Sequence, residues 1–359
     1  MPFRYPDMIS DTSPSSLDVA REAYRAISLY APNREPCAVD LSDNTNLWGV
    51  PPAAERAVRE AALASFTRYP SLYAPALKGA MAAYLGVEPG MIVTGCGSDD
   101  VLDSAIRAFA EPGERVAVPE PSFAMVPIFA RMNALEPVAV PLTPTFDLDA
   151  DAMLATGARV IYLCSPNNPT GNAMSRAAIE RVVERAPGVV ILDEAYAEFA
   201  GANCLELLAR SERLLVVRTM SKAFGLAGLR VGYAAGAPAL VAEVEKSRGP
   251  YKVHALAERA ALAALTDAES MRWVRERVAE VRENRARLVD ELTTLGYETV
   301  PSDANFVLVS IDNAQDVARA MRAAGVAVRP FDIGLRVTVG PWGSMEELLR
   351  VLADARAAE

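Results

Sequence analysis

Histidine is the amino acid in shortest supply in this sequence, since His254 is the only one among 359 residues. Metal sites built from several histidines are therefore excluded, and a catalytic arrangement that needs a histidine base could use only this residue. The four cysteines, Cys37, Cys96, Cys164 and Cys204, are widely spaced and form no C-x-x-C pair. This spacing argues against a zinc site or a disulfide framework and favours a reducing cytoplasm.

The chain also lacks a basic block and a long apolar run. Its formal net charge is −10, which disfavours binding to the phosphates of DNA or RNA. No segment has the ~18 uninterrupted apolar residues that a membrane span needs, and the N-terminus has no basic start and apolar core of a signal peptide. We therefore expect a cytoplasmic protein without a nucleic-acid or membrane partner. A hydrophobic fraction of 51% is ample for a sizeable core.

Short β-rich runs alternate with helical stretches up to about residue 249. They lie at residues 91–95, 115–119, 136–142, 159–164, 189–193, 214–219 and 230–235. Continuous apolar strands separated by helices are typical of a mostly parallel α/β sheet with helices on both faces. A long charged helix over 268–296 and a few further strands predict a smaller α/β domain after that point. We expect an N-terminal arm over 1–45, partly associated with the small domain, a large domain over 46–249 and a small domain over 250–359.

Residues that follow the predicted strands are candidates for a binding site, because ligands of open α/β sheets sit outside the carboxyl ends of the strands. After the first run, Gly97 permits a tight turn, and Ser98 and Asp99 open a helix. The first N–H groups of that helix suit a phosphate, although simple helix capping explains the same pattern. Asn168 lies in a stiff turn between two prolines. Asp193 ends an apolar strand, where a carboxylate is costly to bury unless something pairs with it.

Lys222 lies in the run TMSKAFGLAGLR, residues 219–230, among small, apolar and hydroxyl residues. Burial lowers the pKa of an amine, and a neutral amine can form a Schiff base with a carbonyl compound; a lysine that extends to water is the alternative. Tyr196 and Arg230 are expected at the same sheet edge. A phosphorylated aldehyde with a ring nitrogen and a phenolic oxygen would use this amine, acid, phenol, amide, phosphate-binding turn and arginine together. The set therefore indicates pyridoxal 5′-phosphate.

These motifs, taken in order, resemble those of the fold-type I aminotransferases, and most of all the histidinol-phosphate aminotransferase subgroup. They are LSDNTN, TRYP, GCGSDD, SPNNPTG, LDEAYAEF, RTMSKAFGLAGLRVGY, ANFVLV and LRVTVG. The resemblance implies the fold of PLP-dependent transferases, with a mostly parallel, seven-stranded type of sheet in the large domain. It also implies pyridoxal 5′-phosphate as cofactor, a homodimer with composite active sites, and transfer of an amino group from a donor to a 2-oxo acid.

The same resemblance implies roles for single residues. Lys222, Asp193 and Tyr196 form the expected catalytic group: Lys222 bonds to the cofactor aldehyde and moves the substrate proton, Asp193 pairs with the ring nitrogen, and Tyr196 hydrogen-bonds the ring oxygen. The other expected cofactor contacts are Ser98, Asp99, Phe123, Asn168, Thr219, Ser221, Arg230 and, across the dimer interface, Tyr69. The expected substrate contacts are Arg336, which grips the α-carboxylate, and Asn44, Asn46, Tyr30, Tyr251 and Arg329.

Departures from the family pattern leave the substrate open. Relatives usually carry N-E-N-P-x-G where this chain has NTNLWG, residues 44–49, and the bulkier Leu47–Trp48 pair lies where the substrate mouth is expected. The segment after Arg329 and Pro330 is also short. Histidinol phosphate is the leading substrate, and an aromatic amino acid, which an apolar mouth would suit, is the alternative. A decarboxylase similar to the threonine-phosphate decarboxylases and a non-enzymatic cofactor-fold sensor are further alternatives.

Overall fold

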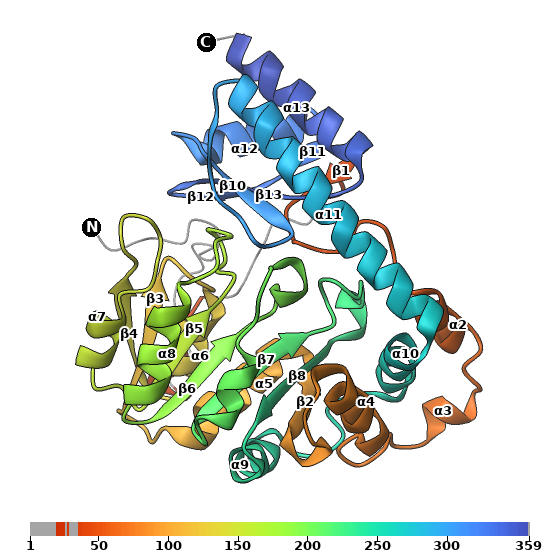
Figure 1. Ribbon diagram of the computed structural model, residues 1–359, viewed down its shortest axis with the longest axis vertical. Coiled ribbons are helices and arrows are strands. Elements are labelled where there is room, and N and C mark those ends of the chain that lie inside the picture. The colour runs from red at the N-terminus through yellow and green to blue at the C-terminus, as the bar shows by residue number, and fades with distance from the viewer. Residues whose placement is uncertain (1–18, 26, 29–34, 358–359) are drawn as a thin grey trace.

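The computed structural model describes residues 19–25, 27–28 and 35–357 (Figure 1). Its largest sheet has seven strands in the order β2-β8-β7-β6-β5-β3-β4. The strands are β2 (Ile92–Cys96), β3 (Arg115–Glu120), β4 (Glu136–Pro141), β5 (Val160–Cys164), β6 (Val189–Asp193), β7 (Leu214–Thr219) and β8 (Val231–Gly236). Only β8 runs antiparallel to its neighbours, β2 and β7, while the other pairs are parallel. The prediction of a mostly parallel sheet is confirmed.

Helices cover both faces of this sheet because its strands are apolar on both sides. In β5, Val160 and Tyr162 pack with one layer of helices, whereas Ile161 and Leu163 pack with the other, as the alternation of side chains along a strand requires. The first layer is α5 (Gly97–Phe109), α6 (Met125–Met132) and α9 (Pro238–Arg248). The second layer is α7 (Ala150–Ala155) and α8 (Arg176–Arg185), with α4 (Pro75–Leu85) and α10 (Ala255–Thr266) over β2 and β8.

A smaller antiparallel sheet lies above the large one in Figure 1. Its strands, in the order β12-β13-β10-β9, are β9 (Glu298–Val300), β10 (Phe306–Ser310), β12 (Arg329–Phe331) and β13 (Gly334–Thr338). Beside it, β1 (Val39–Asp40) pairs in parallel with β11 (Val326–Ala327). The remaining helices are α1 (Glu22–Arg25), α2 (Pro52–Arg59), α3 (Ala64–Thr67), α11 (Ala268–Thr294), α12 (Ala314–Ala323) and α13 (Trp342–Ala357).

The long helix α11 connects the two sheets, since it contacts α2 and α10 near the large sheet and β9, β10 and α13 near the small one (Figure 1). It confirms the long helix predicted over 268–296. The predicted domain boundaries at 45–46 and 249–250 remain predictions. None of the helices in the described part of the chain combines the length and the apolarity that a bilayer span requires.

Several strand ends and two segments from elsewhere in the chain meet at one edge of the large sheet. The carboxyl ends of β2, β5, β6 and β7 lie there, and so does the start of β8, because β8 runs in the opposite direction. Two segments from elsewhere in the chain meet close to this edge. The N–H of Thr338, at the end of β13, donates to the carbonyl of Leu41 at 2.9 Å, and the N–H of Asn44 donates to the Thr338 hydroxyl at 2.9 Å. The small sheet thereby holds residues 41–44 beside the large one.

Candidate active site

A cavity of about 580 Å³ lies at this edge of the large sheet. Its volume is in the range of small-molecule and cofactor sites. The predicted site residues that line it are Asn44, Ser98, Asp99, Phe123, Asn168, Asp193, Tyr196, Thr219, Ser221, Lys222, Arg230 and Arg336. Lining residues outside the predicted set are Asp43, Thr45, Met125, Cys164, Ala195 and Ala227. The structure therefore brings together most of the side chains that the sequence singled out, while their roles remain predictions.

Lys222 follows the end of β7 and is half-buried in the cavity wall. Its Nζ donates to the carbonyl of Asp43 at 3.2 Å and lies 5.8 Å from the centre of the Tyr196 ring. Burial, and secondly the positive charge of Arg336, lower the pKa of Lys222 to about 8, although Asp99 acts in the opposite direction. A substantial part of the amine is therefore neutral near physiological pH, as a nucleophile or proton acceptor must be.

Asp193 is the last residue of β6 and is 4% exposed. Its carboxylate accepts from the Tyr162 hydroxyl at 2.9 Å and from the Ala195 N–H at 3.0 Å. Burial raises the pKa of Asp193 to about 6, and these two hydrogen bonds only partly oppose the rise. Such a carboxylate gains stability when a cation is placed beside it. The sequence analysis missed Tyr162, and the available signal was a phenol inside an apolar strand, because a buried tyrosine hydroxyl usually finds a partner.

The other end of the cavity carries donors for an anion. Helix α5 begins at Gly97, and the N–H groups of its first turn have no partner within the helix. The Thr219 and Ser221 hydroxyls lie 3.0 Å apart, and Arg230 Nη2 lies 3.0 Å from Asp99 Oδ2. A Cβ on Gly97 would come within 2.4 Å of Arg230 Nη2, and the φ of +80° at this position favours glycine as well. Amides, hydroxyls and a guanidinium together suit a phosphate.

Arg336 of β13 closes the cavity from the small sheet and is 8% exposed. Its Nη1 donates to Asn168 Oδ1 and its Nη2 to the Ser42 carbonyl, each at 2.6 Å. The Asn44 amide donates to the Tyr196 hydroxyl at 3.1 Å. A guanidinium fixed in this way presents a planar fork to a carboxylate or phosphate. The expected cofactor contact of Asn168 remains a prediction, and its side-chain oxygen here accepts from Arg336.

Residues 46–48 lie outside the lining of this cavity. The Asn46 amide donates to the Ala223 carbonyl at 3.0 Å. The Trp48 indole donates to Glu280 of α11 at 2.8 Å, and Leu47 packs among the buried residues of the core. Trp48 therefore joins this segment to α11, and the place of the Leu47–Trp48 pair at the substrate mouth remains a prediction. The direction of Trp48 follows from its partner on α11, which the local sequence does not reveal.

Four other predicted residues are not among the lining residues. Tyr69 is 84% exposed and stacks on Tyr251 with 4.9 Å between ring centres. Arg329 lines a separate cavity of about 290 Å³ together with Ser42 and other residues of the small sheet and α12. Tyr30 lies outside the described residues. The substrate roles of Tyr30, Tyr251 and Arg329 and the cofactor role of Tyr69 remain predictions.

Known proteins resemble this chain along most of its length. The family described as aminotransferase class I and II matches residues 37–354. A histidinol-phosphate aminotransferase of Thermobifida fusca is 41% identical over 317 residues, which cover 83% of this chain and 85% of the relative. An aromatic amino acid aminotransferase of Nocardia farcinica is 37% identical over 344 residues, which cover 92% of this chain and 95% of the relative.

The fold resembles solved structures equally well. The histidinol-phosphate aminotransferase of Sinorhizobium meliloti in complex with pyridoxal-5′-phosphate matches with a TM-score of 0.83 and 25% identity, covering 97% of this chain and 100% of that one. The match includes both sheets, because it extends over nearly the whole chain. On the family match, the relatives and the shared fold, this chain belongs to the class I and II aminotransferases, which use pyridoxal 5′-phosphate.

Proposed function

We propose that this aminotransferase takes its amino group from L-histidinol phosphate and passes it to 2-oxoglutarate. The observation that carries the proposal is the pairing of Arg329 with Arg336, which lie directly opposite each other on β12 and β13. Opposite residues of an antiparallel pair project from the same face of the sheet. Ser42 lines the cavity of Arg329, and its carbonyl accepts from Arg336, so this residue contacts Arg336 and borders the cavity of Arg329. Two neighbouring guanidinium groups match a phosphate dianion better than a single carboxylate.

The described residues also fit the cofactor. The donors at the start of α5, with Thr219, Ser221 and Arg230, suit its phosphate, and glycine at position 97 leaves the space beside it to the Arg230 guanidinium. The bound cofactor supplies an aldehyde that carries the amino group and a ring that accepts electrons. Asp193 would hold a proton on the ring nitrogen, which supports that electron flow. Phe123, in the cavity wall, would cover a face of the ring and exclude water.

Proton transfer falls to Lys222 in this proposal. Its neutral amine would take the proton from the substrate Cα and return it on the cofactor side, and a pKa of about 8 suits an acid and base that works near neutral pH. Tyr196 is held by the Asn44 amide, so its hydroxyl is oriented before the substrate binds. Arg336 would hold the acidic group of each substrate in turn and keep the Cα within reach of Lys222.

The substrate is tested by measuring kcat/KM for different amino donors, each with 2-oxoglutarate as the acceptor. We expect kcat/KM to be higher for histidinol phosphate than for phenylalanine. Faster transamination of phenylalanine would instead support the aromatic alternative, which the Nocardia farcinica relative favours. Release of carbon dioxide without net amino transfer would indicate a decarboxylase.

An Arg329→Gln variant gives a sharper test of the phosphate contact. We expect its KM for histidinol phosphate to rise about tenfold, because a hydrogen bond between charged groups is lost, while its KM for phenylalanine stays unchanged. Arg319→Gln is the matched control, since Arg319 lines the same small cavity but is paired with Asp316 at the surface. An equal effect of Arg329→Gln on both substrates would contradict a phosphate contact.

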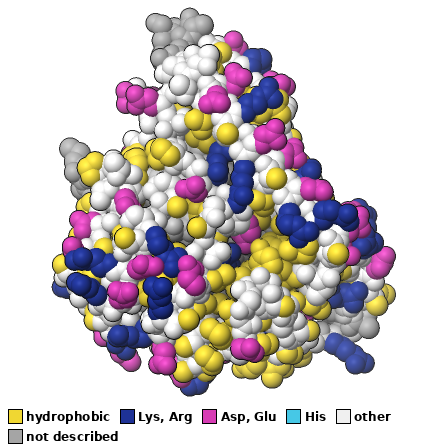
Figure 2. Space-filling view, viewed as in Figure 1, with side chains coloured by type: hydrophobic (Ala, Val, Ile, Leu, Met, Phe, Trp, Pro, Cys, Tyr) yellow, Lys and Arg dark blue, Asp and Glu magenta, His cyan; other side chains and the backbone are white. Residues whose placement is uncertain are grey.

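We further propose a homodimer formed through the segment that carries Tyr69. Large hydrophobic side chains are exposed here at Leu63, Phe66, Tyr69, Leu72, Tyr73 and Tyr251. Figure 2 shows further hydrophobic side chains gathered in the lower central part of the visible face. A monomer seldom exposes such a group of residues, and a second copy would cover it. In this arrangement Tyr69 of one subunit reaches the cofactor phosphate of the other.

Mixing two inactive variants tests the composite site. We expect Tyr69→Ala to have low activity and Lys222→Ala to have none, and we expect activity to return when the two are unfolded, mixed and refolded together. The recovery follows because a mixed dimer keeps one site in which both residues are intact. Activity is measured after the dimers have been separated by size from monomers and aggregates. No recovery in mixed dimers of confirmed composition would contradict a shared site.

A further inference from the structure

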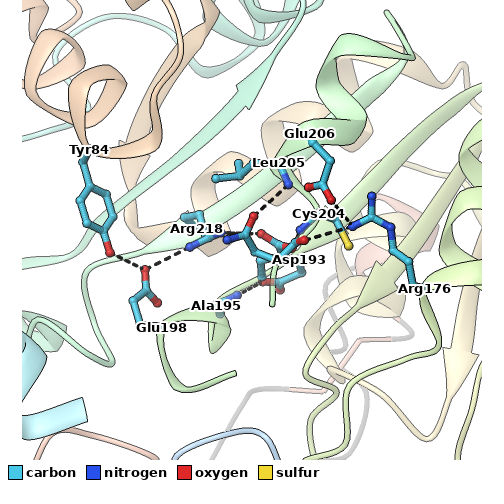
Figure 3. A network of polar contacts seen from close by, with 11 residues as sticks. Tyr84, Arg176, Asp193, Ala195, Glu198, Cys204, Leu205, Glu206 and Arg218 are labelled. Carbon is cyan, nitrogen blue, oxygen red and sulfur yellow. Dashed lines mark hydrogen bonds and ion pairs between the residues drawn. The ribbon is translucent and has the colours of Figure 1, made fainter. Parts of the chain in front are cut away.

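A buried arginine with two glutamates lies next to the cavity without lining it (Figure 3). Arg218 of β7 is 3% exposed. Its Nε and Nη2 donate to Glu194 Oε2 at 2.9 and 2.6 Å, and its Nη1 donates to Glu198 Oε1 at 3.2 Å. The second oxygen of Glu194 accepts from the Cys204 N–H at 2.6 Å. The guanidinium therefore binds two carboxylates at once, in the forked geometry that arginine allows.

This ion-pair cluster lies where the pairing of β6 with β7 ends. The backbone pairing of β6 with β7 ends at Asp193 and Val217, and its last hydrogen bond runs from the Glu194 N–H to the Val217 carbonyl at 2.9 Å. Beyond that point the chain after β6 and the chain after β7 diverge, and the second one leads to Lys222. One residue further along each chain, the side chains of Glu194 and Arg218 form the next contact between the two segments. They join the segment that begins at Asp193 to the segment that ends at Lys222.

Burying these three charged groups contributes less to the stability of the fold than apolar packing would. Two buried carboxylates surround one cation, and burial raises the pKa of Glu198, whose carboxylate also accepts from the Tyr84 hydroxyl at 3.4 Å. Apolar residues of similar volume would avoid the loss of hydration that buried charges suffer. A forked ion pair holds its partners in a fixed geometry, which apolar packing does not. We therefore explain the position of the cluster beside Asp193 by the residues that the cluster orients.

We propose that Arg218 is a positioning residue, which fixes Asp193 relative to Lys222 by binding Glu194 and Glu198 together. The inference rests on the proposed contacts of Asp193 and Lys222 with the cofactor. The ring nitrogen and the aldehyde carbon of pyridoxal 5′-phosphate lie at opposite positions of one rigid ring. An acid and an amine can both meet this ring only when their separation is set in advance. The cluster sets that separation from behind the cavity.

The test measures the affinity of the apoprotein for pyridoxal 5′-phosphate without substrate. We expect Arg218→Met to weaken binding roughly 100-fold, because small displacements of positioned groups have effects of this order. Arg218→Lys keeps the charge but not the fork, so we expect a smaller loss. Arg248→Met is the matched control, because Arg248 is also 3% exposed and pairs with a glutamate, Glu245, away from the cavity. We expect it to lower thermal stability and leave cofactor affinity unchanged.

A second variant separates positioning from burial of charge. Glu194→Gln combined with Arg218→Met removes one charge of each sign, so we expect part of the lost thermal stability to return while the cofactor affinity stays low. Wild-type affinity in Arg218→Met would overturn the proposal, as would recovery of affinity together with stability in the double variant. If Arg218→Met does not fold, Arg218→Lys with wild-type affinity has the same meaning. Failure of the proposed function would appear differently, as a wild-type protein that transaminates neither donor.

Discussion

A Lys222→Ala variant is expected to lose amino transfer by about 10,000-fold or more. Lys222 is the one lysine among the described residues that line the cavity, so no neighbouring amine can take over its proton transfer. Arg336 and Arg230 also line the cavity, but a guanidinium does not lose its proton in proteins. The measurement is the turnover of purified enzyme with each donor and 2-oxoglutarate, alongside a thermal melt that confirms folding.

Lys246→Ala is the matched control for this prediction. Lys246 is an exposed residue of α9 whose amine pairs with Glu243, and we expect its removal to leave turnover unchanged. A Lys222→Ala enzyme that kept several per cent of wild-type activity would contradict the assignment of Lys222 as the base.

The same lysine predicts a pH dependence in the apoprotein. Because burial lowers the pKa of Lys222 to about 8, the reactive neutral amine is the minor form below this pH and the major form above it. We expect the rate at which the apoprotein captures the cofactor aldehyde to rise with pH and to level off above pH 8. A midpoint near the ordinary lysine pKa would show that the amine is not desolvated.

The large sheet and most of its edge could be predicted because local sequence determines them. Apolar strands followed by glycine, asparagine, aspartate or lysine indicate both the strands and their carboxyl ends. Arg230, which the sequence analysis places at the same edge, does not follow the end of a parallel strand. It lies at the same edge only because β8 runs antiparallel, and the order and direction of strands depend on contacts between distant parts of the chain.

Residues and contacts that the sequence analysis missed depend on such distant segments. Tyr162 matters through its bond to Asp193 on the neighbouring strand. Ser42 contributes only a carbonyl, to Arg336 of the small sheet, and no pattern of side chains predicts this contact. Trp48 turns to Glu280, on a helix more than two hundred residues later in the chain. The side chains at the edge of the large sheet were thus easier to predict than the contacts that reach them from distant segments.

An Asp193→Asn variant is expected to slow amino transfer by about 100- to 1,000-fold and to make the apoprotein more stable at pH 8. Turnover falls because a neutral amide cannot hold a proton on the ring nitrogen. The carboxamide has nearly the shape of the carboxylate, and both present contacts can persist. Its oxygen can accept from the Ala195 N–H, and its NH₂ can donate to the Tyr162 hydroxyl, which can either donate or accept.

The gain in stability follows from the raised pKa of Asp193. Folding moves this pKa from 3.8 to about 6, so the folded chain binds the proton more tightly than the unfolded one. The stabilisation by the protonated acid is complete below pH 4 and is lost as the pH rises through 6. Above that pH the buried carboxylate costs the apoprotein up to about 3 kcal/mol, which asparagine avoids. Thermal melts of both apoproteins should therefore agree at acid pH and diverge above pH 6, with the variant melting higher. A variant that melts lower at pH 8 would show that the charge of Asp193 is already balanced by the protein without the cofactor. A variant that is more stable but slower in turnover would show that this carboxylate serves the reaction and not the stability of the fold.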